Sequence, residues 1–376
     1  MVSTLVKIDR ENEYYIFTGP EQLGCEEWKH PNVHIITSDI KGGETFKNLL
    51  WEQIKLPQLA SQYRIDILHS PANMSPLFFY GKSIVHIHDL CFVVNPQWYR
   101  FSFRTWYRFV IPRLVRKATH VVTNSNNSRN DLMQFFKLDP SHVSMVYWAV
   151  DEVFFSKTAS FKIDEQADLN ALIRDGYILY VGSLEPRKNI EVLIEAFVKL
   201  RKKQKNLAVK LVLIGGSNSL FSKIHLPVEE EFKEDIIIKG FVDENTLRVF
   251  YKHAKLVAYP SLYEGFGFPP LEAMASGTAV VTSNSSSIPE IVGDAALQVD
   301  PSDSNALSEA MEEIITHPDL RAALIEKGYQ QVKKFNWNRV ARNILALYHK
   351  VYYSEDIPYE KWESLLKVTK SDQILN

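Results

Sequence analysis

The sequence predicts an α/β fold made of two doubly wound, Rossmann-like domains. Short runs rich in β-branched and aromatic residues alternate with amphipathic helical patterns along most of the chain, which indicates parallel sheets covered by helices on both faces. The length of 376 residues suits two domains rather than one. With 45% hydrophobic residues, the chain can form two sizeable cores.

The first domain is predicted over residues 1–150. Helical patterns at Phe46–Tyr63, Phe101–Lys117 and Arg129–Phe136 separate several of its strands. The strands are expected at Tyr14–Phe17, Val33–Ile36, Ile65–His69, Ser83–His88, His120–Thr123 and Val143–Tyr147.

The second domain is predicted over residues 176–336. The segment 151–175 loses the strong periodicity and is interpreted as a linker, whereas 337–353 is amphipathic and predicts a helix. A polar tail, 354–376, is expected to be peripheral. The strands are expected at Tyr177–Val181, Val209–Ile214, Ile236–Lys239, Leu256–Tyr259, Ala279–Thr282 and Leu297–Val299.

Composition narrows the class of protein. The formal net charge of -2 does not favour nucleic-acid binding, so an anion site must come from a few local cations. The two cysteines, Cys25 and Cys91, do not suggest a disulfide framework and fit a reducing compartment. Because the chain has no apolar run of about 18 residues, a cytoplasmic location is the expected default.

The stretch from Lys255 to Pro289 carries the strongest functional signal. The strand ending at Tyr259 leads into a glycine- and proline-rich loop, and a helix is expected from Leu271 to Ser276, ended by Gly277. Glu264 lies in the loop, and Glu272 is expected in the first helical turn. Loops that follow parallel strands bind ligands in such folds, so this stretch is predicted to be a binding loop.

A second candidate segment, YILYVGSLEPRKN, runs from Tyr177 to Asn189. Its strand ends at Gly182, and Arg187 and Lys188 precede the next helix. A helix N-terminus with a guanidinium and an ammonium beside it suits a phosphate group. An ordinary surface charge pair is the alternative.

The segment VHIHDL ends a strand of the first domain with two histidines on one strand face. His88 is nearer the carboxyl end of the strand, where ligands collect, and is the functional candidate. His86 is interpreted as a core residue. A zinc site is not expected, because no further ligands stand at suitable spacing.

The segment Trp98–Lys117 has Arg100, Arg104 and Arg108 at four-residue intervals among aromatic residues. Such a face suits an anionic acceptor or the headgroups of an anionic membrane, although an ordinary packing helix with solvated arginines is equally compatible. Pro112 is expected to break or kink this helix.

On these motifs the chain resembles glycosyltransferase family 4, the retaining nucleotide-sugar enzymes with the two-domain type B architecture. The resemblance spans about residues 12–353 and is most specific in EGFGFPPLE, which is similar to the paired-glutamate signature of the family. It implies two facing Rossmann-like domains with the donor bound by the second. It also implies that residues 337–353 form the helix that returns to the first domain.

The resemblance also implies roles for individual residues. Glu272 would hold the ribose hydroxyls, Glu264 would approach the donor sugar, and His88 would lie near the reacting centre. Arg187 and Lys188 would neutralise the departing diphosphate. The implied donor-binding set is Gly182, Arg187, Lys188, Glu264, Gly265, Phe266, Gly267, Phe268 and Glu272, with His88, Arg187, Lys188 and Glu264 as the catalytic set.

One departure from the family pattern concerns the first residues. Family members open with a strand and a glycine-rich loop, whereas Val2–Asn12 resembles the end of the helix that follows them. The first domain is therefore expected to be incomplete at its start. A missing central strand would bare unpaired backbone groups, so weak activity and low stability are expected.

The resulting hypothesis is a retaining, metal-independent glycosyltransferase without a cofactor. It would move a sugar from a nucleotide-diphosphate donor to a polysaccharide or lipid-linked glycan, and the GFGFPP form of the loop favours GDP-mannose. It would be cytoplasmic, with peripheral contact at an anionic inner membrane face, and would not bind nucleic acid. The alternatives are a sugar-nucleotide 2-epimerase and an inactive nucleotide-sugar-binding protein.

Overall fold

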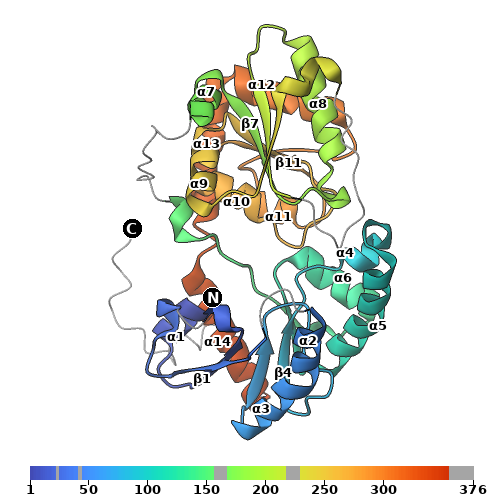
Figure 1. The fold of residues 1–376 in the computed structure, drawn as a ribbon, viewed down its shortest axis with the longest axis vertical. Coiled ribbons are helices and arrows are strands. Elements are labelled where there is room, and N and C mark those ends of the chain that lie inside the picture. Colours follow the sequence, from blue (N-terminus) through green and yellow to red (C-terminus); the bar gives the residue numbers. More distant parts are fainter. Residues whose placement is uncertain (23–24, 41–44, 156–166, 217–228, 355–376) are drawn as a thin grey trace.

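The computed structural model describes residues 1–22, 25–40, 45–155, 167–216 and 229–354. Two α/β domains lie one above the other along the long axis (Figure 1). Among the described residues, no helix is long and apolar enough to span a lipid bilayer.

The strands of the N-terminal domain form two separate parallel sheets in the described part of the chain. Strands β1 and β2 pair only with each other, and the four-stranded sheet has the order β3-β4-β5-β6. This arrangement differs from one continuous doubly wound sheet. The strands are β1 (Tyr14–Thr18), β2 (Val33–Thr37), β3 (Ile67–Ser70), β4 (Lys82–His86), β5 (His120–Thr123) and β6 (Val143–Met145).

Helices flank these two sheets. The pattern predicted at Phe46–Tyr63 forms one helical run, interrupted by a π-helical turn at Trp51–Lys55. Pro112 was expected to break or kink its helix; it does not break it, because α5 is continuous from Phe101 to Lys117. Buried residues on both sides of Pro112, such as Ile111 and Leu114, anchor the helix against the core, which offsets the lost backbone hydrogen bond. The helices are α1 (Val2–Ile8), α2 (Thr45–Leu50), α3 (Leu56–Gln62), α4 (Cys91–Val94), α5 and α6 (Asn126–Phe136).

The C-terminal domain contains one six-stranded parallel sheet with the order β12-β11-β10-β7-β8-β9. Strands β7, β10 and β11 are buried along their whole length, as their continuous apolar runs predict. The strands are β7 (Tyr177–Val181), β8 (Lys210–Ile214), β9 (Ile236–Gly240), β10 (Leu256–Tyr259), β11 (Val280–Ser283) and β12 (Leu297–Val299).

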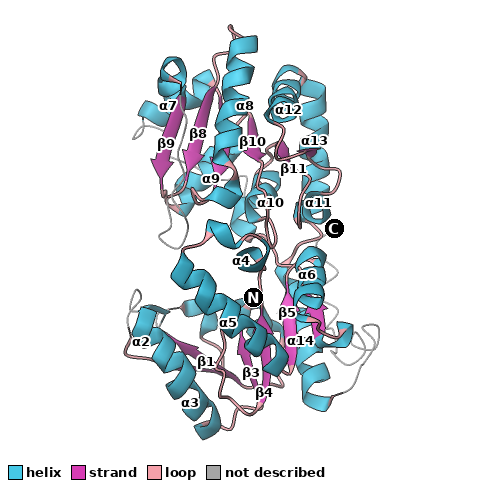
Figure 2. Cartoon of the chain, turned by 90° about the vertical axis from the view of Figure 1, so that its right-hand side faces the viewer, coloured by secondary structure: helices cyan, strands magenta, loops and turns pink. Residues whose placement is uncertain are grey.

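Helices cover the faces of this sheet, with α8 packed against α12 and α10 packed against α13 (Figure 2). The segment predicted as a linker, 151–175, ends in helix α7, and its residues 156–166 lie outside the described part. The helices are α7 (Ala167–Asp175), α8 (Ile190–Lys203), α9 (Glu244–His253), α10 (Phe268–Ala275), α11 (Ile288–Val292), α12 (Ser304–Thr316) and α13 (Pro318–Val332).

Helix α10 begins three residues earlier than predicted, at Phe268, so Glu272 lies beyond the first helical turn. The prediction treated Pro269 and Pro270 as part of the irregular loop. Proline is tolerated at the first positions of a helix, where its missing N–H would have no intrahelical partner. As predicted, Gly277 ends the helix, with a φ of 78 that suits glycine.

The last described helix, α14 (Trp337–Tyr353), crosses back to the N-terminal domain, as Figure 1 shows. Asn336 caps its N-terminus, because the Asn336 side chain accepts a hydrogen bond from the backbone N–H of Arg339. Its apolar face, which includes Ile344, packs with Leu5 of α1 and Ile84 of β4 in one buried cluster. The helix therefore has the predicted bounds. Apart from Ser354, the tail predicted at 354–376 lies outside the described residues.

Candidate active site

Glu264 is the centre of a buried charge cluster in the loop after β10. Its Oε2 accepts a hydrogen bond from Arg187 at 2.7 Å, and its Oε1 accepts one from Lys188 at 2.7 Å. The hydroxyls of Ser261 and Tyr259 also donate to Oε1, at 2.5 and 3.0 Å. Both carboxylate oxygens therefore have partners within the chain.

The order of the strands brings this cluster together. Because β10 lies next to β7 in a parallel sheet, the loops that follow both strands meet at the same edge. The backbone N–H of Leu262 donates to the carbonyl oxygen of Arg187 at 2.8 Å, which joins the two loops. Asn189, in a left-handed conformation, then starts α8 directly after the two cations.

Electrostatics keeps Glu264 ionised. Burial alone would raise the pKa of this carboxyl group, but Arg187 and Lys188 outweigh it and lower the pKa to about 2. Burial lowers the pKa of Lys188, and the charge of Glu264 opposes this shift. Glu185, also buried, lies 3.1 Å from the guanidinium of Arg187. Two carboxylates thus face two cations, so the cluster is close to neutral.

Glu272 lies on α10, and the described contacts give it no hydrogen-bond partner in common with Glu264. The hydroxyl of Tyr251, on α9, donates to its Oε2 at 2.7 Å. Burial raises the pKa of Glu272, and the hydrogen bond from Tyr251 opposes this rise. Tyr251 therefore holds the Glu272 carboxylate in one orientation.

His88 comes from the N-terminal domain and lies against the loop that carries Glu264. A Cβ atom built at Gly265 would be only 2.2 Å from the carbonyl oxygen of His88. The His88 ring stands edge-on to Trp148, with ring centroids 5.6 Å apart. Burial lowers the pKa of His88, and Asp89 opposes this shift. The structure thus brings His88 next to the second domain.

His86 has the core position that was expected for it. It is 1% exposed and stacks on His69, with ring centroids 4.8 Å apart. Neither of its ring nitrogens has a hydrogen-bond partner in the described structure. Over the described ranges of the chain, no group of three or more His, Cys, Asp or Glu side chains is arranged to hold a metal ion.

The remaining predicted residues lie around the same loop. Gly182 follows β7 with a φ of 150. Gly267, with a φ of 127, precedes α10, and the rings of Phe266 and Phe268 meet edge-on at 5.0 Å. The sequence analysis missed Glu185 and Tyr251. A carboxylate two residues before Arg187 was a usable signal for Glu185, whereas no local pattern marks Tyr251.

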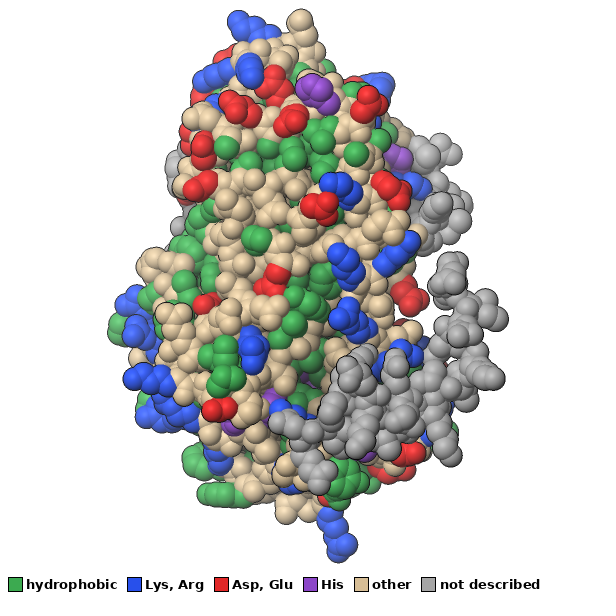
Figure 3. All heavy atoms as spheres, turned by 180° about the vertical axis from the view of Figure 1, so that it is seen from behind, with side chains coloured by type: hydrophobic (Ala, Val, Ile, Leu, Met, Phe, Trp, Pro, Cys, Tyr) green, Lys and Arg blue, Asp and Glu red, His purple; other side chains and the backbone are tan. Residues whose placement is uncertain are grey.

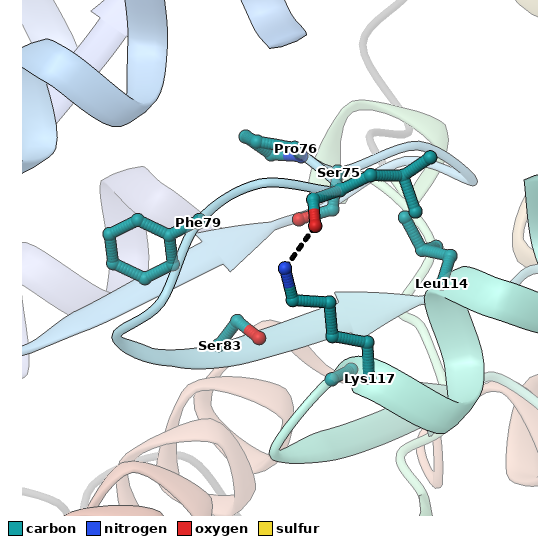
Figure 4. A pocket seen from close by; sticks show the side chains of 8 residues that line it. Ser75, Pro76, Phe79, Ser83, Leu114 and Lys117 are labelled. Carbon is teal, nitrogen blue, oxygen red and sulfur yellow. Dashed lines mark hydrogen bonds between the residues drawn. The ribbon is translucent and has the colours of Figure 1, made fainter. Parts of the chain in front are cut away.

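A small pocket elsewhere does not belong to this site. It lies between the loop that precedes β4 and the end of α5, near Ser83, and Lys117 donates a hydrogen bond to the carbonyl oxygen of Leu77 within it (Figure 4). Ser83 stands near the start of β4, whereas His88 follows the end of this strand. The pocket is therefore at the opposite end of β4 from the charge cluster.

Two family models match the chain. Residues 8–154 match the model described as Glycosyltransferase Family 4, and residues 162–331 match the model described as Glycosyl transferases group 1. The O-antigen chain mannosyltransferase B of Escherichia coli is 28% identical over 287 residues, which cover 76% of this chain and 74% of that protein. The O-antigen chain mannosyltransferase RfbU of Salmonella typhimurium is 28% identical over 62% of this chain and 61% of its own length.

Solved structures with the same fold agree with these matches. The sucrose-phosphate synthase of Thermosynechococcus elongatus superposes with a TM-score of 0.70 at 24% identity, over 86% of this chain and 85% of that one. HepE of Anabaena, solved in complex with UDP, superposes with a TM-score of 0.66 at 15% identity, over 90% of this chain and 100% of that one. The chain therefore belongs to the family 4 glycosyltransferases and has their two-domain type B architecture.

Proposed function

We propose that this chain transfers mannose from GDP-mannose to a polysaccharide or lipid-linked glycan, with retention of configuration and without a metal ion. The observation that carries the proposal is the pair of cations, partly buried Arg187 and buried Lys188, held beside Glu264 at the carboxyl edge of the parallel sheet. The names of the two bacterial relatives, both mannosyltransferases of O-antigen chains, support the choice of sugar and of acceptor class.

The donor would bind across the C-terminal domain. In this proposal Glu272 accepts hydrogen bonds from the ribose hydroxyls, and Glu264 faces the hydroxyls of the sugar. The diphosphate lies at Arg187 and Lys188, with the backbone N–H groups at Gly267 and Phe268 beside it. The start of α10 supports this placement, because the first N–H groups of a helix have no intrahelical partner and favour anions.

In the transfer step, the bond between the sugar C1 and the β-phosphate oxygen breaks while the acceptor hydroxyl oxygen bonds to C1. The acceptor proton passes to the departing phosphate oxygen, and His88 stands on the acceptor side. Arg187 and Lys188 stabilise the charge that develops on the diphosphate. Because hydrogen bonds occupy both oxygens of Glu264, this residue is not proposed as a nucleophile.

The donor can be tested first by thermal unfolding with GDP-, UDP- and ADP-sugars, since a ligand of the native state raises its melting temperature. We expect GDP-mannose and GDP to give the largest rise. Radiolabelled GDP-mannose with EDTA and a mannan or lipid-linked acceptor should then yield GDP and an α-mannoside. Protection by UDP-sugars alone would overturn the donor, and an absolute need for a divalent ion would overturn metal independence.

The same assay separates the alternatives. An epimerised nucleotide sugar without a glycoside would indicate a 2-epimerase, and GDP binding without turnover would indicate a binding protein. Neither alternative is supported by the relatives described above, which are named as transferases.

We also propose that α5 touches an anionic membrane surface on the cytoplasmic side, where a lipid-linked acceptor would lie. Phe101 and Phe109 are exposed on this helix, with Arg104 and Arg113 over their respective rings at 5.0 and 3.6 Å. Figure 3 shows basic side chains gathered with hydrophobic ones along the edge of the N-terminal domain where α5 lies. Such a surface combines apolar area with attraction to anionic lipids.

Vesicle binding tests this contact. The chain should sediment with vesicles that contain phosphatidylglycerol but not with vesicles of phosphatidylcholine alone. A double change of Arg104 and Arg108 to Gln should reduce binding about thirtyfold, at about 1 kcal/mol for each basic residue. Changing Lys202 and Lys203, on α8 of the other domain, to Gln is the matched control. Equal binding to both kinds of vesicle would contradict the proposal.

A further inference from the structure

Glu290 belongs to α11 of the C-terminal domain, but its carboxylate is bound by the other domain. Oε1 accepts a hydrogen bond from the backbone N–H of Asn127 at 2.9 Å. Oε2 accepts three more, from the backbone N–H of Asn126 at 3.0 Å, from its side-chain amide at 2.9 Å and from the hydroxyl of Tyr147 at 2.8 Å. One side chain thus makes four contacts across the domain boundary.

These contacts complete the N-terminus of helix α6. Ser125 precedes this helix, and its hydroxyl accepts a hydrogen bond from the N–H of Ser128 at 3.1 Å. The N–H groups of Asn126 and Asn127, in the same first turn, have no intrahelical acceptor and take Glu290 instead. A carboxylate at the positive end of a helix is also electrostatically favourable. The C-terminal domain therefore supplies part of the cap of a helix in the N-terminal domain.

The capped end of α6 is bonded to His88. The hydroxyl of Ser128 donates to the carbonyl oxygen of His88 at 3.2 Å. In the orientation that satisfies its neighbours, the amide nitrogen of Asn124 donates to the carbonyl oxygens of His88 at 2.7 Å and of Gly265 at 3.0 Å. A movement of α6 relative to α11 would consequently move His88 away from the loop that carries Glu264.

The two domains are in close contact at Gly265, where a larger side chain would not fit. The space that a Cβ atom at Gly265 would need is filled by the His88 carbonyl and by Asp89. Tyr147 connects Glu290 to the same loop, because its ring lies 6.4 Å from that of Phe266 and 5.5 Å from that of Phe335, which precedes α14. Glu290 therefore acts where the loop meets the segments that cross between the domains.

We propose that Glu290 is a positioning residue that holds His88 against the donor loop in the arrangement in which transfer occurs. This inference rests on the proposed glycosyl transfer. In the described structure Glu290 makes no hydrogen bond to Arg187, Lys188, Glu264 or Glu272. Its loss should therefore slow turnover without weakening binding of the nucleotide.

The variants Glu290→Ala and Glu290→Gln test this separation. Because small misplacements at a reacting centre cost up to about a hundredfold in rate, we expect Glu290→Ala to lower kcat by about tenfold to a hundredfold. The Kd for GDP should stay within about twofold of the wild-type value, which is a change in binding free energy of less than 1 kcal/mol. The reason is that Glu290 makes no described hydrogen bond to the proposed donor-binding residues. Glu290→Gln should be intermediate, because its carbonyl oxygen still accepts one N–H. The control is Glu312→Gln, since the described hydrogen bonds of the Glu312 carboxylate come from Lys203 and Gln204 of its own domain, at 2.6 Å each.

Small-angle X-ray scattering gives a second measurement that does not depend on turnover. Glu290→Ala should have a larger radius of gyration than the wild type, and Glu312→Gln should not. The positioning role would be overturned if Glu290→Ala had the same kcat as the wild type. It would also be overturned if Glu290→Ala lost affinity for GDP by the same factor as it lost kcat. A wild-type chain that binds GDP but forms no glycoside would instead overturn the proposed function, whatever the scattering shows.

Discussion

Glu264 is a buried carboxylate whose charge is balanced by two cations in direct contact. The cluster contains a guanidinium with two carboxylate neighbours, Glu264 and Glu185, and an ammonium that also reaches Tyr259 at 2.5 Å. Burying these charges is costly unless every one of them is paired. Under the proposed function, these two cations would face the diphosphate of the donor.

Glu264→Gln should destabilise the chain strongly, because it leaves Arg187 and Lys188 buried without their main counter-charge. We expect the free energy of unfolding to fall by about 3–5 kcal/mol, as for other broken buried pairs. Urea unfolding at neutral pH measures this change. The partly exposed pair of Glu312 is the control, and Glu312→Gln should cost about 1 kcal/mol or less. Equal losses for the two variants would show that the cluster is not a buried pair in solution.

Tyr251→Phe should loosen Glu272 without changing the shape of the core. If Glu272 binds ribose, affinity for GDP should fall about tenfold, since a hydrogen bond to a charged group contributes about 1.5–3 kcal/mol. Binding of inorganic pyrophosphate, which lacks ribose, should not change. Calorimetry on both ligands gives the comparison.

The matched control is Tyr177→Phe. Tyr177 is another buried tyrosine of the same domain, and its hydroxyl donates to the backbone carbonyl of Phe250 at 2.8 Å. This variant should bind both ligands as the wild type does. If Tyr251→Phe weakens pyrophosphate as much as GDP, the ribose role of Glu272 is wrong.

At the scale of elements, the loop between β10 and α10 carries Glu264 and also contacts the segments that cross between the domains. Its two phenylalanines pack against the crossing segments, Phe266 beside Phe335 at 5.8 Å and Phe268 beside Trp148 at 6.3 Å between ring centroids. Trp148 in turn contacts the ring of His88. The rings of Phe268, Trp148 and His88 therefore link this loop to the N-terminal domain.

Gly265→Ala should separate the two halves of the site. A methyl group there would lie 2.2 Å from the His88 carbonyl oxygen and 2.9 Å from the Cβ of Asp89, and backbone cannot move aside as a flexible side chain can. We expect kcat to fall by about tenfold or more, because the reacting groups would no longer be aligned. Steady-state kinetics with GDP-mannose measures this loss.

Gly240→Ala is the comparison for that change. The Cβ position of Gly240 has nothing within 4 Å, although its φ of 67 disfavours alanine. This substitution should cost about 1–2 kcal/mol of stability and leave kcat unchanged. Unchanged kcat in Gly265→Ala would mean that the two domains do not meet at this residue during turnover.

At the scale of the whole molecule, α14 ties the end of the C-terminal domain to the core of the N-terminal domain. The hydroxyl of Tyr348, on this helix, is 2.7 Å from Nδ1 of His69, which stacks on His86. Burial lowers the pKa of His69 to about 4 and lowers that of His86 well below its usual value. Both histidines are therefore neutral in the folded chain at neutral pH.

These histidines should make the fold sensitive to acid. Their unfolded-state pKa is about 6.5, so below that pH the unfolded chain binds protons that the folded chain excludes. The stability should accordingly be complete above about pH 6.5 and fall as the pH drops towards 4, by on the order of 3 kcal/mol for His69 alone. Urea unfolding between pH 7.5 and about 4.5 follows this loss.

His86→Leu should reduce the loss of stability at low pH, because it replaces one titrating side chain with an apolar one of similar volume. At neutral pH it should not be destabilising, since both ring nitrogens of His86 lack hydrogen-bond partners in the described structure. His317→Gln, at an exposed histidine, is the control for this change. An unaltered pH profile in His86→Leu would contradict this account.

Much of the local structure follows from the sequence. The strand Tyr177–Val181 and the helix Trp337–Tyr353 have the predicted bounds. Their spacing of apolar residues, continuous in the strand and periodic in the helix, can be recognised within each segment alone. The candidates Arg187, Lys188 and Glu264 were also chosen from the sequence, because each follows a strand of the parallel sheet; their roles in binding stay predictions. The family follows from the same motifs.

Only the tertiary structure decided which of these groups meet. Arg187 and Glu264 are 77 residues apart, and the order of the strands, with β10 beside β7, brings them together. Tyr251 reaches Glu272 from another helix, and Glu290 reaches Asn127 over 163 residues from the other domain. The N-terminal strands form two sheets, and this division depends on which strands pair with one another. Such contacts depend on long-range packing between surfaces, which periodicity within one segment does not encode.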